Sequence, residues 1–203
     1  MTDLVLALLS GMVGGLVIAS LPRISSRLRN ILALVFTAAA TYFTWRVAQT
    51  ATLWLCATVY SFGYMAGEPR QRTYYSFFLL SLTTTLGIAF SGNLLAVYLF
   101  YELLTFATYP LVIHERDGEA IKAGSKYIIY SLSGAGAILI AIIIVYSWTG
   151  NLDFTGGPLL ADCGLRPGLG WVLALFVAGF GVKAAIMPLH RWLPAAMCAP
   201  TPV

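Results

Sequence analysis

The chain has 203 residues, of which 59% are hydrophobic and 10% are charged, with a formal net charge of +4 and a mean hydropathy of +0.83. Soluble globular domains carry about 25% charged residues, so this composition excludes a soluble domain and predicts an all-α, polytopic bundle of transmembrane helices in a lipid bilayer. The positive charge requires no nucleic-acid partner, because basic residues also act as topology signals in membrane proteins.

Seven apolar segments are candidates for membrane spans, each of which takes about 20 residues of helix at about 1.5 Å per residue. They are residues 4–21, 30–48, 50–66, 73–91, 93–113, 123–148 and 168–190. The first begins at Leu4 with no basic residues before it, which favours a retained span over a cleaved signal peptide. The second and third leave one long bent helix open as an alternative, since only Arg46 and Gln49 interrupt their apolar pattern.

Basic residues favour the model with seven spans and the N-terminus outside, because eight of them then fall in inner loops and two in outer loops. The inner ones are Arg23, Arg27, Arg29, Arg70, Arg72, Arg116, Lys122 and Arg191, and the outer ones are Arg46 and Arg166. One helix over 30–66 would invert the later loops and violate the positive-inside rule. We therefore expect a multi-pass protein of the cell's inner (plasma) membrane.

Three charged residues fall inside the expected spans: Glu102, Lys126 and Lys183. A charge at mid-membrane costs about 2.5–3.5 kcal/mol on insertion scales, so such residues usually serve a function or pair with one another. From the helix rise, Glu102 lies about 14 Å and Lys183 about 18–22 Å from the outer surface, while Lys126 lies within about 7 Å of the inner one. Glu102 and Lys183 are therefore expected to meet near the midplane.

Helical spacing predicts a polar face on three of these spans. The faces are Tyr98–Glu102–Thr105–Tyr109, Lys126–Tyr130–Ser133 with Gly134 beside it, and Gly179–Lys183–His190. Hydroxyl and small residues beside a buried charge leave room for water, and water carries protons.

Each charged residue also has a purely structural interpretation. Glu102 and Lys183 could form a salt bridge that only holds helices together, and Lys126 could extend its ammonium group to the inner interface. His190, near the cytoplasmic edge, could be an interfacial residue. Gly134 and Gly136 favour close helix packing rather than a function.

Two prolines are expected to break or kink their helices, because proline lacks a backbone N–H. Pro188 follows Lys183, and Pro110 lies near the end of the Glu102 span. Broken membrane helices are tolerated where they line a cavity or are buried in protein, and they often mark ion sites.

The three cysteines, Cys56, Cys163 and Cys198, are odd in number and lack the spacing of metal ligands. We therefore expect no disulfide and no metal site. The sequence likewise gives no sign of a cofactor or of a redox centre within this chain.

Three stretches resemble the antiporter-like subunits shared by respiratory complex I, membrane-bound hydrogenases and Mrp-type cation/proton antiporters. They are "YELLTFATYPLVIH" (101–114), "EAIKAGSKYIIYSL" (119–132) and "GFGVKAAIMPLHRWLPAAMCAPTPV" (179–203), within a similarity over roughly 60–203. The resemblance implies that Glu102 and Lys183 form a central pair that gates proton movement and that Lys126 modulates it. It also implies a helix broken at Pro188, and a place for His190 in a water chain.

The same resemblance implies an incomplete unit. Family members have about fourteen spans built from two inverted repeats. We expect residues 1–66 to form N-terminal transmembrane helices and residues 67–203 to form a partial first repeat that ends before its last helix. Many members also carry an acidic residue after "WLP", where this chain has Ala195 and Ala196.

The resemblance implies a proton-translocating subunit, or part of one, in a redox-driven complex of the NADH or ferredoxin:quinone oxidoreductase or hydrogenase type. Its partners would be other membrane subunits and peripheral redox subunits linked to quinone, NADH or ferredoxin. Two alternatives remain open: a D-like sodium/proton antiporter component of the Mrp type, and a non-conducting structural subunit.

Overall fold

The computed structural model describes residues 48–154 and 167–200, which fold into helices joined by short turns. Their bounds are α3 Ala48–Tyr64, α4 Gln71–Ala89, α5 Leu94–Val112, α6 Gly118–Thr149, α7 Leu169–Lys183, the 3₁₀ turn η4 Leu189–Arg191 and α8 Trp192–Ala196. The described residues contain no β-strand, only an isolated antiparallel bridge between Asn93 and Asp153. The expectation of an all-helical protein is therefore confirmed for this part of the chain.

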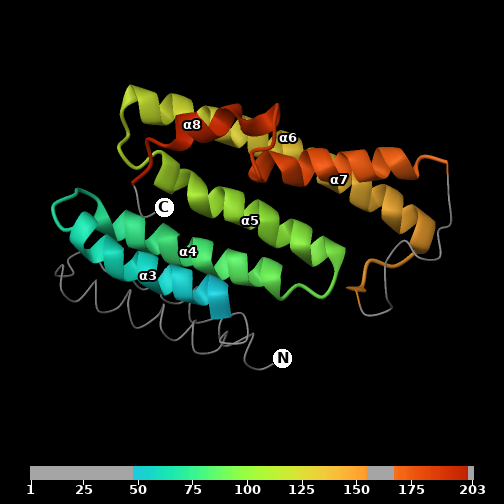
Figure 1. The fold of residues 1–203 in the computed structure, drawn as a ribbon, viewed down its shortest axis with the longest axis horizontal. Coiled ribbons are helices and arrows are strands. Elements are labelled where there is room, and N and C mark those ends of the chain that lie inside the picture. Colours follow the sequence, from blue (N-terminus) through green and yellow to red (C-terminus); the bar gives the residue numbers. More distant parts are fainter. Residues whose placement is uncertain (1–47, 155–166, 201–203) are drawn as a thin grey trace.

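Figure 1 shows α4, α5 and α6 side by side in chain order, with α7 and α8 both lying along α6. By length and composition, α5 and α6 can each cross a membrane, whereas α7 is apolar but has only 15 residues. The expected spans from 50–66 onward each contain a helix, but 168–190 is not one continuous helix. The expected spans 4–21 and 30–48 lie outside the described residues, apart from Ala48.

Side-chain caps fix where the two long apolar helices begin. The Asn93 carboxamide oxygen accepts a hydrogen bond from the Ala96 N–H at 2.7 Å, and the Asp117 carboxylate accepts one from the Ala120 N–H at 2.6 Å. Each cap satisfies one of the backbone donors that a helix leaves unpaired in its first turn. The negative charge of Asp117 also suits the positive end of the helix dipole.

Pro110 does not break its helix, so of the expected break or kink only the kink stays a prediction. The α5 helix continues through Pro110 and ends at Val112. Proline removes one backbone hydrogen bond, and here the loss falls in the last turn, where few helical bonds remain to be disturbed.

Glycine brings α6 and α7 into close contact. A Cβ atom added at Gly134 would lie 2.9 Å from the Gly179 carbonyl oxygen, and one added at Gly179 would lie 2.7 Å from the Gly134 carbonyl oxygen. Gly136, in contrast, has no atom of the described residues within 4 Å of a Cβ position. The expected packing role is therefore confirmed for Gly134 and is wrong for Gly136.

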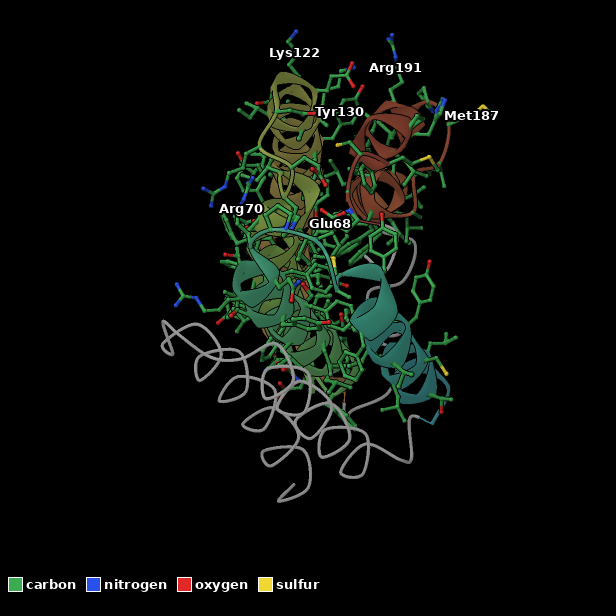
Figure 2. All side chains as sticks on the ribbon, turned by 90° about the vertical axis from the view of Figure 1, so that its left-hand side faces the viewer. Glu68, Arg70, Lys122, Tyr130, Met187 and Arg191 are labelled. Atoms are coloured by element: carbon green, nitrogen blue, oxygen red, sulfur yellow. The ribbon has the colours of Figure 1, made fainter. Side chains whose placement is uncertain are left out.

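The α3–α4 and α5–α6 connections lie at the same end of the bundle, on the left in Figure 1. The Arg70 guanidinium donates a hydrogen bond to the His114 carbonyl oxygen at 2.9 Å, and the His114 imidazole Nε2 lies 3.2 Å from the Pro69 carbonyl oxygen. Figure 2 looks at this end and labels Glu68 and Arg70 on the α3–α4 connection. Arg70, Arg116 and their loops therefore share one end, as the topology from sequence requires.

We predict that Gly134→Ala destabilises the purified protein in detergent by about 1–3 kcal/mol, the usual effect of an added methyl group that has no room. The measurement is the free energy of unfolding in a denaturant titration. Gly136→Ala is the matched control, because it makes the same change two residues away in open space. Equal stability of the two variants would contradict the packing role of Gly134.

We predict that the folded protein loses stability in acid because of His114. Burial lowers the pKa of the imidazole below its ordinary value, and the nearby Arg70 charge adds to this, while the Pro69 hydrogen bond and the Glu115 and Glu68 charges oppose it. The unfolded chain then binds more protons than the folded one, so stability falls as the pH drops below about 6.5.

The measurement is the thermal unfolding midpoint between about pH 8 and pH 5 in native protein and in His114→Gln. Glutamine keeps a donor for the Pro69 carbonyl but does not titrate, so its midpoint should fall less steeply. Parallel curves for the two proteins would contradict this assignment.

Candidate functional site

Lys183 is the last residue of α7, and this position favours a positive charge. The last carbonyl groups of a helix carry a partial negative charge, which stabilises a cation in the final turn. The side chain is half-buried between α7 and the neighbouring helices. The chain therefore places an ammonium group at a helix end within the bundle rather than in mid-helix.

Side chains from two other helices bind the backbone near this helix end. The Tyr101 hydroxyl of α5 donates to the Gly179 carbonyl oxygen at 3.1 Å, and the Trp192 indole N–H of α8 donates to the Val182 carbonyl oxygen at 2.7 Å. A carbonyl oxygen can accept two hydrogen bonds, and the Val182 oxygen also accepts one from the Ala185 N–H at 3.1 Å. These two bonds therefore stabilise the end of α7 at Lys183.

The end of α7 comes before Pro188, not at it. After Lys183, Ala184 caps the helix, Ala185 adopts a left-handed conformation with φ of 50°, and the peptide bond between Met187 and Pro188 is cis. The Ile186 N–H donates to the Gly181 carbonyl oxygen at 3.0 Å, which closes the turn. Pro188 therefore lies in a segment that has already left the helix, ahead of η4.

The Lys183 ammonium group is held by tyrosines. It donates a hydrogen bond to the Tyr127 hydroxyl of α6 at 2.7 Å, and it lies 4.9 Å from the centre of the Tyr127 ring and 5.5 Å from that of Tyr101. A cation within about 6 Å of a ring face is attracted to it. The charge is thus stabilised by one neutral hydroxyl and two aromatic rings.

Glu102 makes no direct ion pair with Lys183, although both lie in the described part of the chain. The two are near enough for their charges to interact, yet the lysine's hydrogen bond goes to Tyr127. Glu102 is half-buried, and its Oε1 atom is buried with no hydrogen-bond partner among the described residues. The Glu102 carboxylate and the Lys183 amine, which were expected to pair, therefore lie near each other without direct contact.

Lys126 lies on an exposed face of α6, away from Lys183. The buried face of this helix is Tyr127, Ser131, Gly134 and Ile138, at spacings of four, three and four residues. The expected polar face of Lys126, Tyr130 and Ser133 is turned from it by roughly one residue, which is about 100° of helix. Ser133 is exposed, and its hydroxyl donates to the Ile129 carbonyl of its own helix.

His190 does not share a helical face with Lys183, because α7 ends before it. It lies in η4, partly buried, and its Nδ1 atom is buried without a hydrogen-bond partner among the described residues. Along residues 48–154 and 167–200, no group of three or more His, Cys, Asp or Glu residues could hold a metal ion.

Sequence reasoning did not identify Tyr127 and Thr108 as candidate site residues. The Tyr127 hydroxyl lies 2.6 Å from the Thr108 hydroxyl, and the latter donates to the Leu104 carbonyl oxygen at 2.7 Å. The available signal was the spacing of Tyr127 with Ser131 and Gly134, which marks the buried face of α6 more accurately than the charge at Lys126.

Comparison with known proteins assigns the family. A model of the transmembrane region of NADH:quinone oxidoreductases and Mrp antiporters matches residues 91–203, more than half of the chain. The chain belongs to this family. The match includes the Glu102, Tyr127 and Lys183 helices.

Relatives come from both branches of the family. NADH-quinone oxidoreductase subunit N of Desulforudis audaxviator is 33% identical over 77% of this chain, and a Na(+)/H(+) antiporter component of Bacillus subtilis is 31% identical over 76% of it. These matches cover 32% and 31% of the two relatives, so the chain spans about a third of their length.

Two solved structures share the fold. A chain of the membrane-bound sulfane sulfur reductase, an archaeal respiratory membrane complex, has a TM-score of 0.86 and 22% identity, with 100% of this chain and 49% of that one covered. A chain of respiratory complex I from Thermus thermophilus, solved with bound aureothin, has a TM-score of 0.74 and 22% identity, with 94% and 46% covered.

We predict that Trp192→Phe loosens the segment after Lys183 while leaving the bundle folded. The variant loses the indole bond to the Val182 carbonyl, which contributes about 1 kcal/mol. Hydrogen–deuterium exchange should become faster over residues 184–196 and stay unchanged in α4 and α5. Trp171→Phe is the control, since Trp171 is 78% exposed at the start of α7. Unchanged exchange in the Trp192 variant would contradict this role.

Proposed function

We propose that the chain is part of a proton-translocating membrane subunit in which Lys183 gains and loses the transported proton. The observation that carries this proposal is the Lys183 ammonium group, half-buried at a helix end and bonded to a neutral hydroxyl. A lysine paired only with a hydroxyl and rings can become a neutral amine without leaving an anion behind. A lysine in a tight salt bridge would lose that freedom, because removing its charge strands a buried carboxylate.

Glu102 is proposed as the group that changes the proton affinity of Lys183. A carboxylate that approaches a lysine stabilises its charged form, and one that withdraws or binds a proton favours release. The buried and unpartnered Oε1 atom leaves Glu102 free to change partners in this way. The observed separation would be one state of the pair, and a closer pairing the other.

Lys126 and His190 are proposed to act outside this pair. Lys126 would modulate it as an exposed charge on the same helix as Tyr127. His190 would extend the proton path beyond the end of α7, since its buried Nδ1 atom can accept a hydrogen bond.

The proposed setting is the plasma membrane, in a complex with other membrane subunits. The basic end of the bundle, with Arg70 and Arg116, would face the cytoplasm and the N-terminus the outside. Energy would come from peripheral redox subunits linked to quinone, NADH or ferredoxin, and the chain would hold no redox centre itself. Residues 67–203 would then correspond to part of one antiporter-like repeat.

An antiporter of the Mrp type is the second candidate, and it is supported by the Bacillus subtilis relative, whose name states sodium/proton exchange. The two functions use the same lysine and differ in what drives it. Sodium-dependent pH changes in vesicles without an electron donor would favour the antiporter. Proton uptake that requires an electron donor would favour the redox complex.

We predict that Lys183→Met abolishes proton translocation in vesicles containing the intact complex, and that Glu102→Gln reduces it strongly. Both substitutions remove a titratable group while keeping similar volume. The measurement is the quenching of a pH-sensitive dye on addition of an electron donor or of sodium.

Lys122→Met is the matched control, because Lys122 is exposed and extends away from the helices in Figure 2. It should translocate protons at the native rate. Native rates in an assembled Lys183→Met complex would refute the proposed function and favour a purely structural subunit.

A further inference from the structure

The hydrogen bonds from Lys183 continue past Tyr127 without interruption. The ammonium group donates to the Tyr127 oxygen at 2.7 Å, that oxygen lies 2.6 Å from the Thr108 oxygen, and Thr108 donates to a backbone carbonyl at 2.7 Å. Because the ammonium group occupies the Tyr127 oxygen as a donor, and Thr108 donates to Leu104, the Tyr127 O–H is left to donate to Thr108. The donors therefore all point away from Lys183.

The last two hydroxyl groups lie on a cavity. Thr108 and Tyr127 line a cavity of about 590 Å³ between α5, α6 and α8, whose other walls include Val112, Trp192, Leu193 and Met197. A single water molecule needs only about 15 Å³ in this kind of measure, together with polar partners. The cavity has room for several, and the two hydroxyls supply oxygens to which they can bond.

We propose that Tyr127 and Thr108 form the proton relay that connects Lys183 with water in this cavity. The proposal rests on the proposed function, because it assigns the residues through which the Lys183 proton would leave or enter. Tyr127 is buried, at 4% exposure, and it lies on the wall of this cavity. Hydrogen bonds already connect Lys183 through Tyr127 to Thr108, which lines the cavity.

The proton balance of one release is simple. Thr108 first turns its O–H from the Leu104 carbonyl to a cavity water. Lys183 then transfers a proton to the Tyr127 oxygen, Tyr127 transfers its own hydroxyl proton to Thr108, and Thr108 transfers its hydroxyl proton to that water. The products are a neutral lysine amine and one hydronium ion, and both hydroxyl groups are regenerated. Rotation of the hydroxyls then restores their starting orientation, and proton uptake follows the reverse order.

Neighbouring groups do not offer the same connection. Tyr101, on α5, uses its hydroxyl to bond the Gly179 carbonyl. Glu102 makes no direct bond to Lys183 among the described residues, and Lys126 is on the exposed face of α6. Tyr101, Glu102 and Tyr127 are thus the titratable groups facing Lys183 within the described helices, and only Tyr127 continues to the cavity.

The experiment compares Tyr127→Phe and Thr108→Val in the assembled complex, by dye quenching in vesicles. Each variant removes one hydroxyl and keeps the side-chain shape. Tyr127→Phe should lower the translocation rate about tenfold or more, as for a lost hydrogen bond to a charged group, and Thr108→Val should lower it similarly because it interrupts the same chain. The double variant should be no slower than the slower single variant, because both remove links of one chain. Thr108→Ser, which keeps the hydroxyl, should retain most of the native rate.

Tyr130→Phe is the matched control, since Tyr130 lies one turn further along α6 and has no hydrogen bond among the described residues. It should behave as native protein. Native rates in both Tyr127→Phe and Thr108→Val, with Lys183→Met inactive, would overturn the relay and leave the proposed function standing. An equal loss in Thr108→Ser and Thr108→Val would attribute the effect to packing and also overturn it. Native translocation in Lys183→Met would overturn both proposals.

Discussion

A single positive charge at the end of α7 organises this part of the molecule. An ammonium group away from water must be stabilised by the protein, and here the helix dipole, one hydroxyl and two ring faces provide that stabilisation. None of these groups carries a negative charge of its own. The arrangement therefore stabilises the cation without a direct ion pair, which is compatible with the proposed release of a proton by Lys183.

The packing of the bundle serves the same position. The close contact between Gly134 and Gly179 brings α7 against α6, and this contact places the end of α7 beside Tyr127. Tyr101 and Trp192 then bind the carbonyl groups of Gly179 and Val182, so the end of α7 is fixed from both sides. The same interactions consequently pack the helices, hold the end of α7 and place the Lys183 charge. A substitution that alters one of these features should alter the others.

Family membership and the geometry of the site limit different aspects of the function. The family includes both quinone oxidoreductase subunits and cation/proton antiporter subunits, so membership alone does not choose the driving force. The geometry of the site bears on proton transfer and not on the driving force. The described residues contain a titratable lysine, a nearby carboxylate and hydroxyl groups that lead to a cavity. Under the proposed function, protonation and deprotonation of the half-buried Lys183 is the step to which these residues contribute.

Sequence reasoning predicted the helical segments from 50–66 onward and the shared end of the basic loops, because composition and charge placement are local properties. The expected pair of Glu102 and Lys183 stays a prediction, since the Lys183 ammonium group bonds Tyr127 here. Sequence reasoning failed for features that depend on contacts between residues far apart in the sequence. Bonds from Tyr101 and Trp192 hold the last turns of α7, and helix propensity contains no information on such contacts.

The orientation of α6 shows the same limit. A charge at Lys126 suggested one face, but packing against α7 buries the face of Tyr127, about 100° away. The contact between Lys183 and Tyr127 joins residues 56 positions apart, so no local pattern predicts it.

The most direct test of the central claim is chemical rescue of the charge at position 183. In a background without the native cysteines, Lys183→Cys should not translocate protons in vesicles. Reaction with an aminoethyl thiosulfonate reagent, which restores an amine on a chain of similar length, should recover translocation, while a neutral methyl thiosulfonate reagent should not. Recovery with both reagents, or native activity of the untreated variant, would contradict the claim that a protonatable amine at this helix end carries the function.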